Sequence, residues 1–198
     1  MIFFNRKSKA VKPVRPLLHT ERLVLRSFDP NDAVDLYAFA RSETVGYMAG
    51  FTPHQSLEDS RRMVKQFIDS GAVWAIVEKR SGRVIGFASL QKDDSRPVPN
   101  ARKLAYTLGE EYWGQGYATE TCRELIRYAF EVRDCAVLAV SHFPFNQKSK
   151  RVIKKLGFTY EGVLRHAHAL PDGSVSDLVC YSLLKPEYEA RKAGKNGG

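Results

Sequence analysis

The chain has 198 residues, of which 43% are hydrophobic, and its 31 basic and 22 acidic residues give a formal net charge of +9. This length fits one globular domain with a core of its own. No stretch approaches the ~18 consecutive apolar residues that cross a bilayer, and the apolar run at the N-terminus is too short for a signal peptide. We therefore expect a cytoplasmic protein with no membrane partner.

The positive charge is concentrated at the two ends of the chain. Residues 1–16 carry five basic residues and no acidic one, residues 185–198 carry a net +2, and residues 17–184 carry the remaining +2. A basic leader of this kind can bind an acidic partner or be a solvated arm, and both interpretations stay open. Residues 17–184 lack a basic stripe with interleaved aromatic residues, so we expect no dedicated nucleic-acid site.

The cysteine pattern gives no sign of a disulfide framework or a metal site. Cys122, Cys135 and Cys180 are odd in number and have no CxxC spacing, which argues against both. We expect three small, buried apolar side chains and no metal.

The first half of the chain alternates strand and helix signals. The turn residues at 29–32 precede a helical pattern, and Ser56, with Asp59 three residues later, predicts a capped helix that ends at glycine. Arg80-Ser81-Gly82 separates two apolar runs and predicts a hairpin turn. These signals predict a strand at 22–28, helices at 33–40 and 56–71, a loop at 43–55, and paired strands at 73–79 and 83–90.

The second half continues the alternation after a polar loop at 91–102. Its apolar runs and helical periodicities predict strands at 103–109, 136–143, 157–164 and 178–184, and helices at 118–132 and 146–156.

This order of elements predicts an α/β or α+β fold with helices on the faces of one mixed sheet. The hairpin makes the sheet mostly antiparallel, and helix 118–132 implies a parallel crossover between the strands that flank it. We expect one domain over 17–185, a flexible basic leader at 1–16 and a C-terminal tail at 186–198. The GKNGG end of that tail has the composition of a disordered segment.

The segment EEYWGQGYATET at 110–121 joins a predicted strand to a predicted helix. Gly114 and Gly116 lack Cβ atoms, so the backbone can turn tightly and a ligand can approach it. The free N–H groups of the first helical turn, together with the helix dipole, form an anion site that fits a phosphate or pyrophosphate. The alternative is a tight strand–helix turn that binds nothing.

A second segment, PFNQKSKRVIKKLGF at 144–158, places Asn146 and Ser149 at the start of a basic helix. Asn146 can be interpreted as an N-cap or as a ligand-binding residue. Ser149 lies one turn further on and faces the same end, and Gly157 ends the helix.

Together, GEEYWGQGYATE and FNQKSKRVIKKLGFTYEG resemble the GCN5-related N-acetyltransferases (GNAT), and more narrowly their RimJ/RimL-like branch, which acetylates protein N-termini and small amines. The resemblance covers roughly residues 17–185. It implies the GNAT fold, with a mixed, mostly antiparallel sheet of six to seven strands flanked by about four helices. It also implies that acetyl-CoA is the acetyl donor and that no metal takes part.

The resemblance implies which residues bind acetyl-CoA. The glycine loop would cradle the pyrophosphate, the end of the strand 103–109 would pair with the pantetheine arm, Asn146 would bind that arm, and Ser149 would lie near the thioester sulfur. Glu111 stands where many members have Gln or Arg, and we expect its carboxylate to point to solvent. The implied cofactor-binding residues are Tyr106, Thr107, Leu108, Trp113, Gly114, Gln115, Gly116, Tyr117, Ala118, Asn146 and Ser149.

In the chemistry that the resemblance implies, an acetyl group passes directly to an amine, which requires a donor for the carbonyl oxygen, an acid for the leaving thiolate and a base for the amine proton. The N–H of Leu108 is the candidate for stabilising the carbonyl oxygen as it gains charge, and the hydroxyl of Ser149 is the candidate acid for the leaving thiolate. Glu110 is the nearest candidate base in the sequence. His142, Tyr106 and an ordered water are alternative bases.

The sequence gives fewer indications of the residues that bind the acceptor amine than of those that bind acetyl-CoA. Residues 43–55 resemble the region that shapes the acceptor pocket in this branch, although packing of a loop on the core is an equal alternative. The two histidines after the strand 157–164 lack a third ligand, so we expect no metal there. The residues expected near the acceptor are Tyr47, Met48, Phe51, Arg165, His166 and His168.

We therefore expect an acetyl-CoA-dependent N-acetyltransferase that acts on a protein N-terminal amine, for example that of a ribosomal protein. An alternative acceptor is a small amine such as a polyamine, an amino sugar or an amino acid, although Glu43 alone supplies acidic charge in 43–55. A non-catalytic acyl-CoA-binding module is a third possibility. The protein could be a monomer or a homodimer, with the closing strand 177–184 as a candidate dimer contact.

Overall fold

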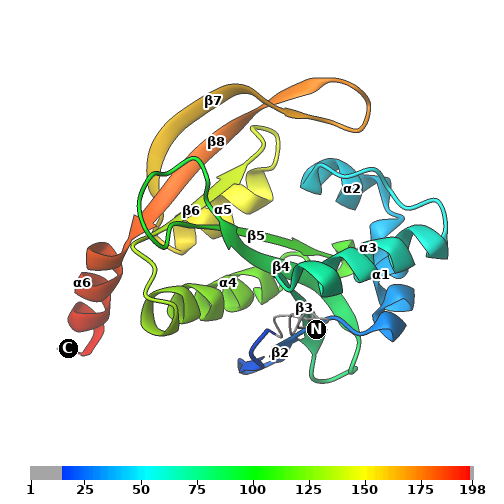
Figure 1. The fold of residues 1–198 in the computed structure, drawn as a ribbon, viewed down its shortest axis with the longest axis horizontal. Coiled ribbons are helices and arrows are strands. Elements are labelled where there is room, and N and C mark those ends of the chain that lie inside the picture. Colours follow the sequence, from blue (N-terminus) through cyan, green and yellow to red (C-terminus); the bar gives the residue numbers. More distant parts are fainter. Residues whose placement is uncertain (1–14, 197–198) are drawn as a thin grey trace, which may run out of the picture.

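The computed structural model describes residues 15–196, which form an eight-stranded sheet with helices on both faces (Figure 1). Residues 1–14 of the expected leader and residues 197–198 lie outside the described part. The strands are β1 Leu18–His19, β2 Leu23–Arg26, β3 Val73–Glu78, β4 Val84–Lys92, β5 Arg102–Leu108, β6 Val137–His142, β7 Thr159–Ala169 and β8 Val175–Leu184. They are ordered β1-β2-β3-β4-β5-β6-β8-β7.

Helices fill three of the seven connections between these strands, and one more helix follows β8. They are α1 Ala33–Ala40, α2 Glu43–Ala49, α3 Leu57–Ser70, α4 Tyr117–Arg127, α5 Gln147–Lys155 and α6 Lys185–Asn196. Tyr128–Val132 continues α4 as a π-helical turn, and 3₁₀ turns form at Pro30–Asp32 and Glu110–Tyr112. The predicted fold class is confirmed, although the sheet has one strand more than expected because the two-residue β1 pairs with β2.

The sheet opens between β5 and β6. These two strands are parallel, as predicted for the strands that flank helix 118–132, and all other neighbouring strands are antiparallel. They pair only at Arg102 with Leu138 and at Lys103 with Ala139. From there to Leu108, β5 has no pairing with β6, so the two strands diverge and leave a gap in the sheet.

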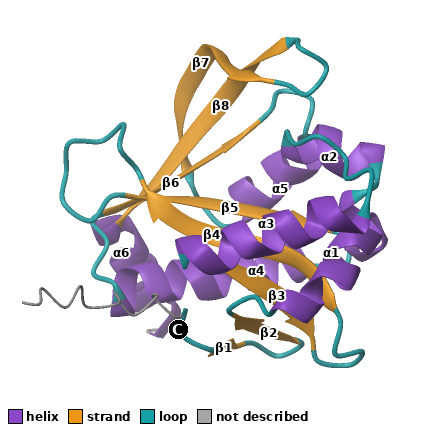
Figure 2. Ribbon diagram, turned by 45° about the vertical axis from the view of Figure 1, so that its right-hand side comes forward, coloured by secondary structure: helices purple, strands orange, loops and turns teal. Residues whose placement is uncertain are grey.

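Two hydrophobic cores hold the strands from opposite faces of the sheet (Figure 2). On one face, α1 and α3 bury Leu36 and Val64 against β3 and β4. On the other face, α4 and α5 bury Leu125 and Ile153 against β5, β6 and β8. Burial of each such side chain contributes roughly 1.5–3 kcal/mol to the stability of the fold. Packing against α4 and α5 therefore stabilises β5 and β6, the two strands that border the gap.

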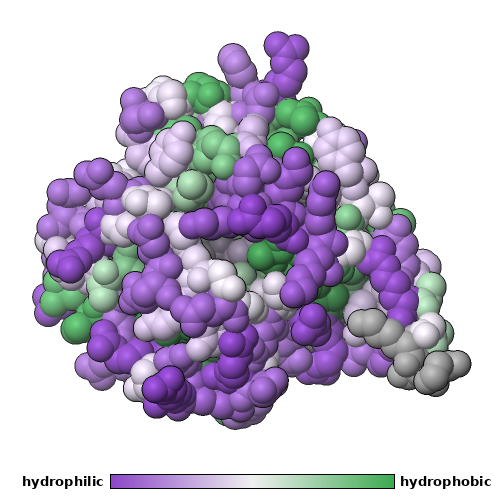
Figure 3. All heavy atoms as spheres, turned by 180° about the vertical axis from the view of Figure 1, so that it is seen from behind, coloured by the Kyte–Doolittle hydropathy of each residue, from purple (hydrophilic) through white to green (hydrophobic). Residues whose placement is uncertain are grey.

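The surface opposite to the view of Figure 1 is mainly hydrophilic, and apolar residues show in a hollow near its centre (Figure 3). Within residues 15–196, no helix has the length and apolar character needed to cross a bilayer.

Helix α3 confirms the local signals in its sequence. The hydroxyl of Ser56 accepts the N–H of Asp59, and the Asp59 carboxylate accepts the N–H of Ser56, so the predicted capping box is present. The helix ends at Gly71, which is left-handed.

The expectation of a loop over 43–55 was wrong for its first half, because Glu43–Ala49 form α2. The hydroxyl of Ser42 caps this helix by accepting the N–H of Val45 at 3.3 Å, and Gly50 ends it. A helix this short is marginal on its own, and the packing of buried Val45 on the rest of the domain stabilises it.

The end of the chain also differs from expectation, because α6 starts at the last residue of the predicted domain and continues through residues 186–196 of the predicted tail. The ring of Tyr188 stacks on Phe130 with centroids 5.0 Å apart, and its hydroxyl donates to Glu131 at 2.7 Å. These contacts dock α6 on the end of the α4 segment. The closing strand β8 lies between β6 and β7, so the idea that it forms a dimer edge was wrong; β7 is the edge strand at this end of the sheet.

Candidate active site

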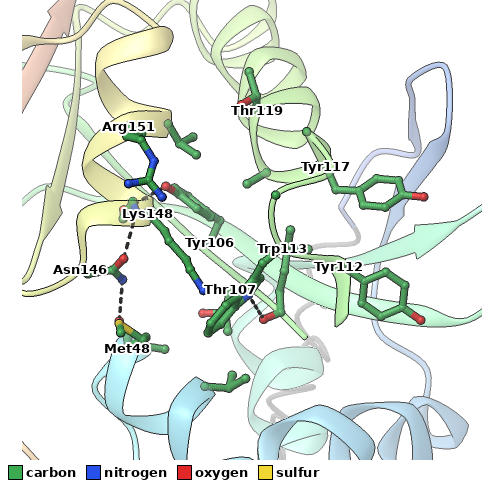
Figure 4. A pocket seen from close by; sticks show the side chains of 18 of the residues that line it. Met48, Tyr106, Thr107, Tyr112, Trp113, Tyr117, Thr119, Asn146, Lys148 and Arg151 are labelled. Carbon is green, nitrogen blue, oxygen red and sulfur yellow. Dashed lines mark hydrogen bonds between the residues drawn. The ribbon is translucent and has the colours of Figure 1, made fainter. Parts of the chain in front are cut away.

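A cavity of about 360 Å³ lies where β5 and β6 diverge (Figure 4). It is bounded by α2, the end of β5, the glycine loop with the start of α4, and α5. Its lining residues are Val45, Met48, Ala49, Tyr106, Thr107, Leu108, Tyr112, Trp113, Gly114, Gly116, Tyr117, Ala118, Thr119, Asn146, Lys148, Ser149, Arg151, Val152 and Lys155. Ten of the eleven predicted cofactor-binding residues are among them, and Gln115 is the exception.

The end of β5 turns unpaired backbone groups toward this cavity. Gly109 donates its N–H to Ile85 of β4 at 2.9 Å, and hydrogen-bonding residues alternate along an antiparallel pair. Thr107 therefore faces β4, whereas the backbone groups of Tyr106 and Leu108 face the gap. The carbonyl oxygen of Leu108 accepts the indole N–H of Trp113 at 2.9 Å, and the Leu108 N–H lies on the same open side.

The glycine loop presents an uncapped helix end. Gly114 and Gly116 have φ values of +76° and +86°, which favour glycine. Gly116 is the N-cap residue of α4, and no side chain caps the first turn of this helix. Its N–H groups are therefore available to an anion, which favours the phosphate interpretation of the loop over the simple turn.

A clamp that the sequence did not predict, formed by Arg22 just before β2, holds this loop from outside. The guanidinium of Arg22 pairs with the Glu120 carboxylate at 2.7 Å, donates to the carbonyl of Gln115 at 3.0 Å, and lies 4.2 Å from the ring centroid of Tyr117. Burial alone would raise the pKa of Glu120, but hydrogen bonds from Thr20 and Arg22 outweigh it and hold that pKa below its ordinary value.

The charged groups that line the cavity are all cationic. Lys148, Arg151 and Lys155 project from α5, and no Asp or Glu is among the lining residues. Lys148 lies with its ammonium 3.9 Å from the ring centroid of Trp113. Residues three, four and seven apart share a helix face, so the spacing of Lys148, Arg151 and Lys155 within KSKRVIKK carried this signal beyond the basic character of the helix.

Asn146 and Ser149 begin α5 and lie in the cavity wall. The Asn146 side-chain oxygen accepts the N–H of Ser149 at 2.9 Å, which confirms its N-cap role. Its side-chain nitrogen donates to the carbonyl of Met48 at 3.0 Å (Figure 4). Both groups of this amide are therefore used within the protein, and α2 is tied to the start of α5.

The two sequence-predicted bases lie outside the cavity lining. Glu110 is exposed, and its carboxylate accepts the hydroxyl of Ser42 at 3.5 Å. His142 is buried, with its ring nitrogens 2.7 Å from the Phe143 carbonyl and 3.3 Å from the Tyr181 hydroxyl. Among the candidate bases, Tyr106 alone lines the cavity. Glu111 is exposed, as expected.

The expected acceptor residues separate into two groups. Met48 lines the cavity, whereas Tyr47 stacks on Phe145 with centroids 4.4 Å apart and Phe51 lies 5.9 Å from the ring of His54. The remaining three come from β7: Arg165 and His166 are exposed, and His168 packs 5.1 Å from the Phe143 ring. Within residues 15–196, no group of three or more His, Cys, Asp or Glu side chains could hold a metal ion.

The cavity fits a long acyl thioester with a pyrophosphate. Apolar side chains of α2 and β5, the uncapped start of α4 and three α5 cations line it together. A carboxylate in the lining would repel the phosphates, and none is present among the lining residues. Acetyl-CoA would place its phosphates at the α4 end and its thioester near Leu108 and Ser149.

Comparison with known proteins gives the same assignment. The acetyltransferase (GNAT) domain family matches residues 22–159. The [Ribosomal protein uS5]-alanine N-acetyltransferase of Escherichia coli (strain K12) is 25% identical over 86% of this chain and 92% of its own. The uncharacterized N-acetyltransferase YoaA of Bacillus subtilis (strain 168) is 29% identical over 86% and 98%.

Solved structures share the fold. The ribosomal-protein-S5-alanine acetyltransferase of Vibrio fischeri superposes with a TM-score of 0.74 at 20% identity, covering 88% of this chain and 99% of its own. With a domain match over most of the chain and an open β5–β6 gap at the cavity, the chain belongs to the GNAT N-acetyltransferases, enzymes that use acetyl-CoA as the acetyl donor.

Proposed function

We propose that this enzyme acetylates an α-amine, most specifically the N-terminal amine of a protein. The observation that carries the proposal is the charge of the cavity: Lys148, Arg151 and Lys155 line it, and no carboxylate does. An acceptor must therefore reach the thioester as a neutral amine without help from a lining carboxylate.

The ordinary pKa values of amines then decide between acceptor classes. Only a neutral amine has the lone pair that attacks a carbonyl carbon. With a pKa near 7.7–8.0, about a third of an α-amine is neutral at pH 7.5, whereas an ε-amine with a pKa near 10.4 is only about 0.1% neutral. No carboxylate among the lining residues offers a partner to an ammonium or to the second charge of a polyamine.

The residues around the expected thioester have separate tasks. The N–H of Leu108, on the open side of β5, would donate to the carbonyl oxygen as it gains charge. The hydroxyl of Ser149 would meet the sulfur. The amine proton would pass to solvent, directly or by way of exposed Glu110, since neither Glu110 nor His142 lines the cavity.

The relative from Escherichia coli is named for an alanine of a ribosomal protein, and this supports a protein N-terminus as the acceptor here. Apolar Val45, Met48 and Ala49 at the α2 end suit a small apolar first residue. A free amino acid or a small peptide, which also presents an α-amine, is the second candidate. A polyamine and a non-catalytic module are the weaker alternatives.

Thiol release from acetyl-CoA with matched acceptors tests this proposal. A peptide with a free N-terminal alanine and no lysine would be compared with the same peptide acetylated at its N-terminus and carrying one lysine, and with spermidine and an amino sugar. We expect turnover with the first peptide, at least 10-fold faster than with the others. Turnover with spermidine or the amino sugar alone would move the enzyme to small-amine acetylation.

A further inference from the structure

The hydroxyl groups of Tyr106 and Ser149 lie 2.9 Å apart and join β5 to α5 across the gap in the sheet. Both residues line the cavity. Over the part of the chain that the structure describes, the Ser149 hydroxyl has no other hydrogen-bond partner. The orientation of the Ser149 hydroxyl therefore depends on its contact with Tyr106.

Either hydroxyl could donate in this contact, and the surroundings of Tyr106 favour the phenol as the donor. Burial raises the pKa of Tyr106 well above its ordinary value, and nearby Cys122 adds to the shift, so the phenol keeps its proton at every working pH. No second acceptor for this phenol lies within hydrogen-bond range in the described residues. If Ser149 donated instead, the phenol proton of half-buried Tyr106 would have no acceptor among the described residues, which is unfavourable.

With the phenol as donor, the serine oxygen accepts one hydrogen bond and its own proton is free. The geometry points to Tyr106 as a positioning residue that turns the Ser149 hydroxyl toward the sulfur leaving acetyl-CoA. This inference rests on the proposed function, because it needs a bound acyl thioester.

The step balances without a change in the protonation of either residue. The amine nitrogen forms a bond to the thioester carbonyl carbon, the carbon–sulfur bond breaks, and its electron pair goes to sulfur. The amine proton goes to solvent. Ser149 donates a hydrogen bond to the developing thiolate, Tyr106 holds Ser149 in that orientation, and the thiolate takes a proton from solvent after transfer.

A double-mutant cycle separates this role from packing. We expect Tyr106→Phe and Ser149→Ala each to lower kcat roughly 10-fold, less than full acid catalysis would supply because a thiolate is a good leaving group, with the KM for acetyl-CoA within about twofold. The double variant should be no slower than Ser149→Ala alone. Multiplying effects would contradict the coupling.

Tyr181→Phe is the control for loss of a tyrosine hydroxyl that bonds another side chain inside the domain. Its hydroxyl lies 3.3 Å from the imidazole of His142, away from the cavity lining. This variant should lower the Tm as much as Tyr106→Phe does and leave kcat unchanged. A similar fall in kcat for both variants would assign the Tyr106 effect to general destabilisation.

A second measurement needs no acceptor and therefore separates this inference from the proposed function. The pKa of the thiol of bound CoA, followed by thiolate absorbance, should be lower in the wild type than in Tyr106→Phe and Ser149→Ala, and equal in those two. Equal values in all three proteins would overturn the inference. A lower thiol pKa in the wild type, with no turnover on any amine, would support the role of Tyr106 and refute the proposed function. Failure of CoA to bind would refute both the role of Tyr106 and the proposed function.

Discussion

The indole N–H of Trp113 donates to the carbonyl oxygen of Leu108 at 2.9 Å, so a side chain of the glycine loop fixes the last residue of β5. Lys148 covers the same ring from α5, with its ammonium 3.9 Å from the centroid. Trp113 also packs against both hydrophobic cores. One side chain thus connects β5, the glycine loop and α5.

Trp113→Phe keeps an aromatic ring but removes the indole donor. The Leu108 carbonyl loses its partner, and the N–H of the same residue loses its fixed direction. We expect kcat/KM to fall roughly 10-fold, since small misplacements at a reacting centre cost up to about 10². Steady-state kinetics with acetyl-CoA would show this, and a kcat/KM equal to that of the wild type would mean that the hydrogen bond does not position β5.

Gly116→Ala tests whether the glycine loop binds the phosphates of acetyl-CoA. At φ +86° an added Cβ costs roughly 1–2 kcal/mol of strain, and it would lie 3.3 Å from the Arg22 guanidinium. The strain and the methyl group would disturb the uncapped start of α4. We expect the Kd for acetyl-CoA, measured by calorimetry, to rise about 10-fold or more, by the roughly 1.4 kcal/mol that a tenfold change represents.

Gly82→Ala is the control for that strain. Gly82 lies in the β3–β4 turn at φ +71°, and no atom lies within 4 Å of the added Cβ. The Tm of Gly82→Ala should fall by about as much as that of Gly116→Ala, while its affinity for acetyl-CoA stays at the wild-type value. A weaker affinity in both variants would show that the loss in Gly116→Ala comes from general destabilisation.

The Arg22–Glu120 pair makes part of the stability depend on pH. The folded-state pKa of Glu120 is depressed, so its contribution is complete above the unfolded pKa, near 4.3, and is lost as the pH falls through the lower folded value. We expect Glu120→Gln to lower the Tm at pH 7 by a few degrees. The difference from the wild type should shrink as the pH falls from about 5 to 3. A constant difference across that range would contradict the assignment.

Local signals in the sequence predicted the elements that carry their own caps. Ser56 and Asp59 identified the start of α3, and Asn146 identified the start of α5, because capping depends on residues three positions apart. Helix α2 is also capped, by Ser42 and Gly50, but its seven residues are marginal alone, and it forms because the domain buries Val45. Packing also supports α6, whose stacking partner Phe130 lies 58 residues before Tyr188.

The sequence predicted the parts of the cavity wall that short motifs mark. It did not predict the contacts between segments that are far apart in the chain. The glycine loop and Ser149 were found from two short motifs. The Arg22–Glu120 clamp joins residues 98 positions apart, and the bond from Tyr106 to Ser149 joins residues 43 apart, so neither has a local pattern. Exposure of Glu110 and burial of His142 also depend on tertiary packing.

The most direct test of the central claim is the pH dependence of kcat/KM for an N-terminal alanine peptide at saturating acetyl-CoA. If no group of the cavity acts as the base, the rate should rise with pH and level off near pH 8, where the α-amine itself becomes neutral. For a lysine ε-amine the rise should continue toward pH 10. A plateau that begins near pH 6 for both acceptors would reveal an enzymic base and contradict the account.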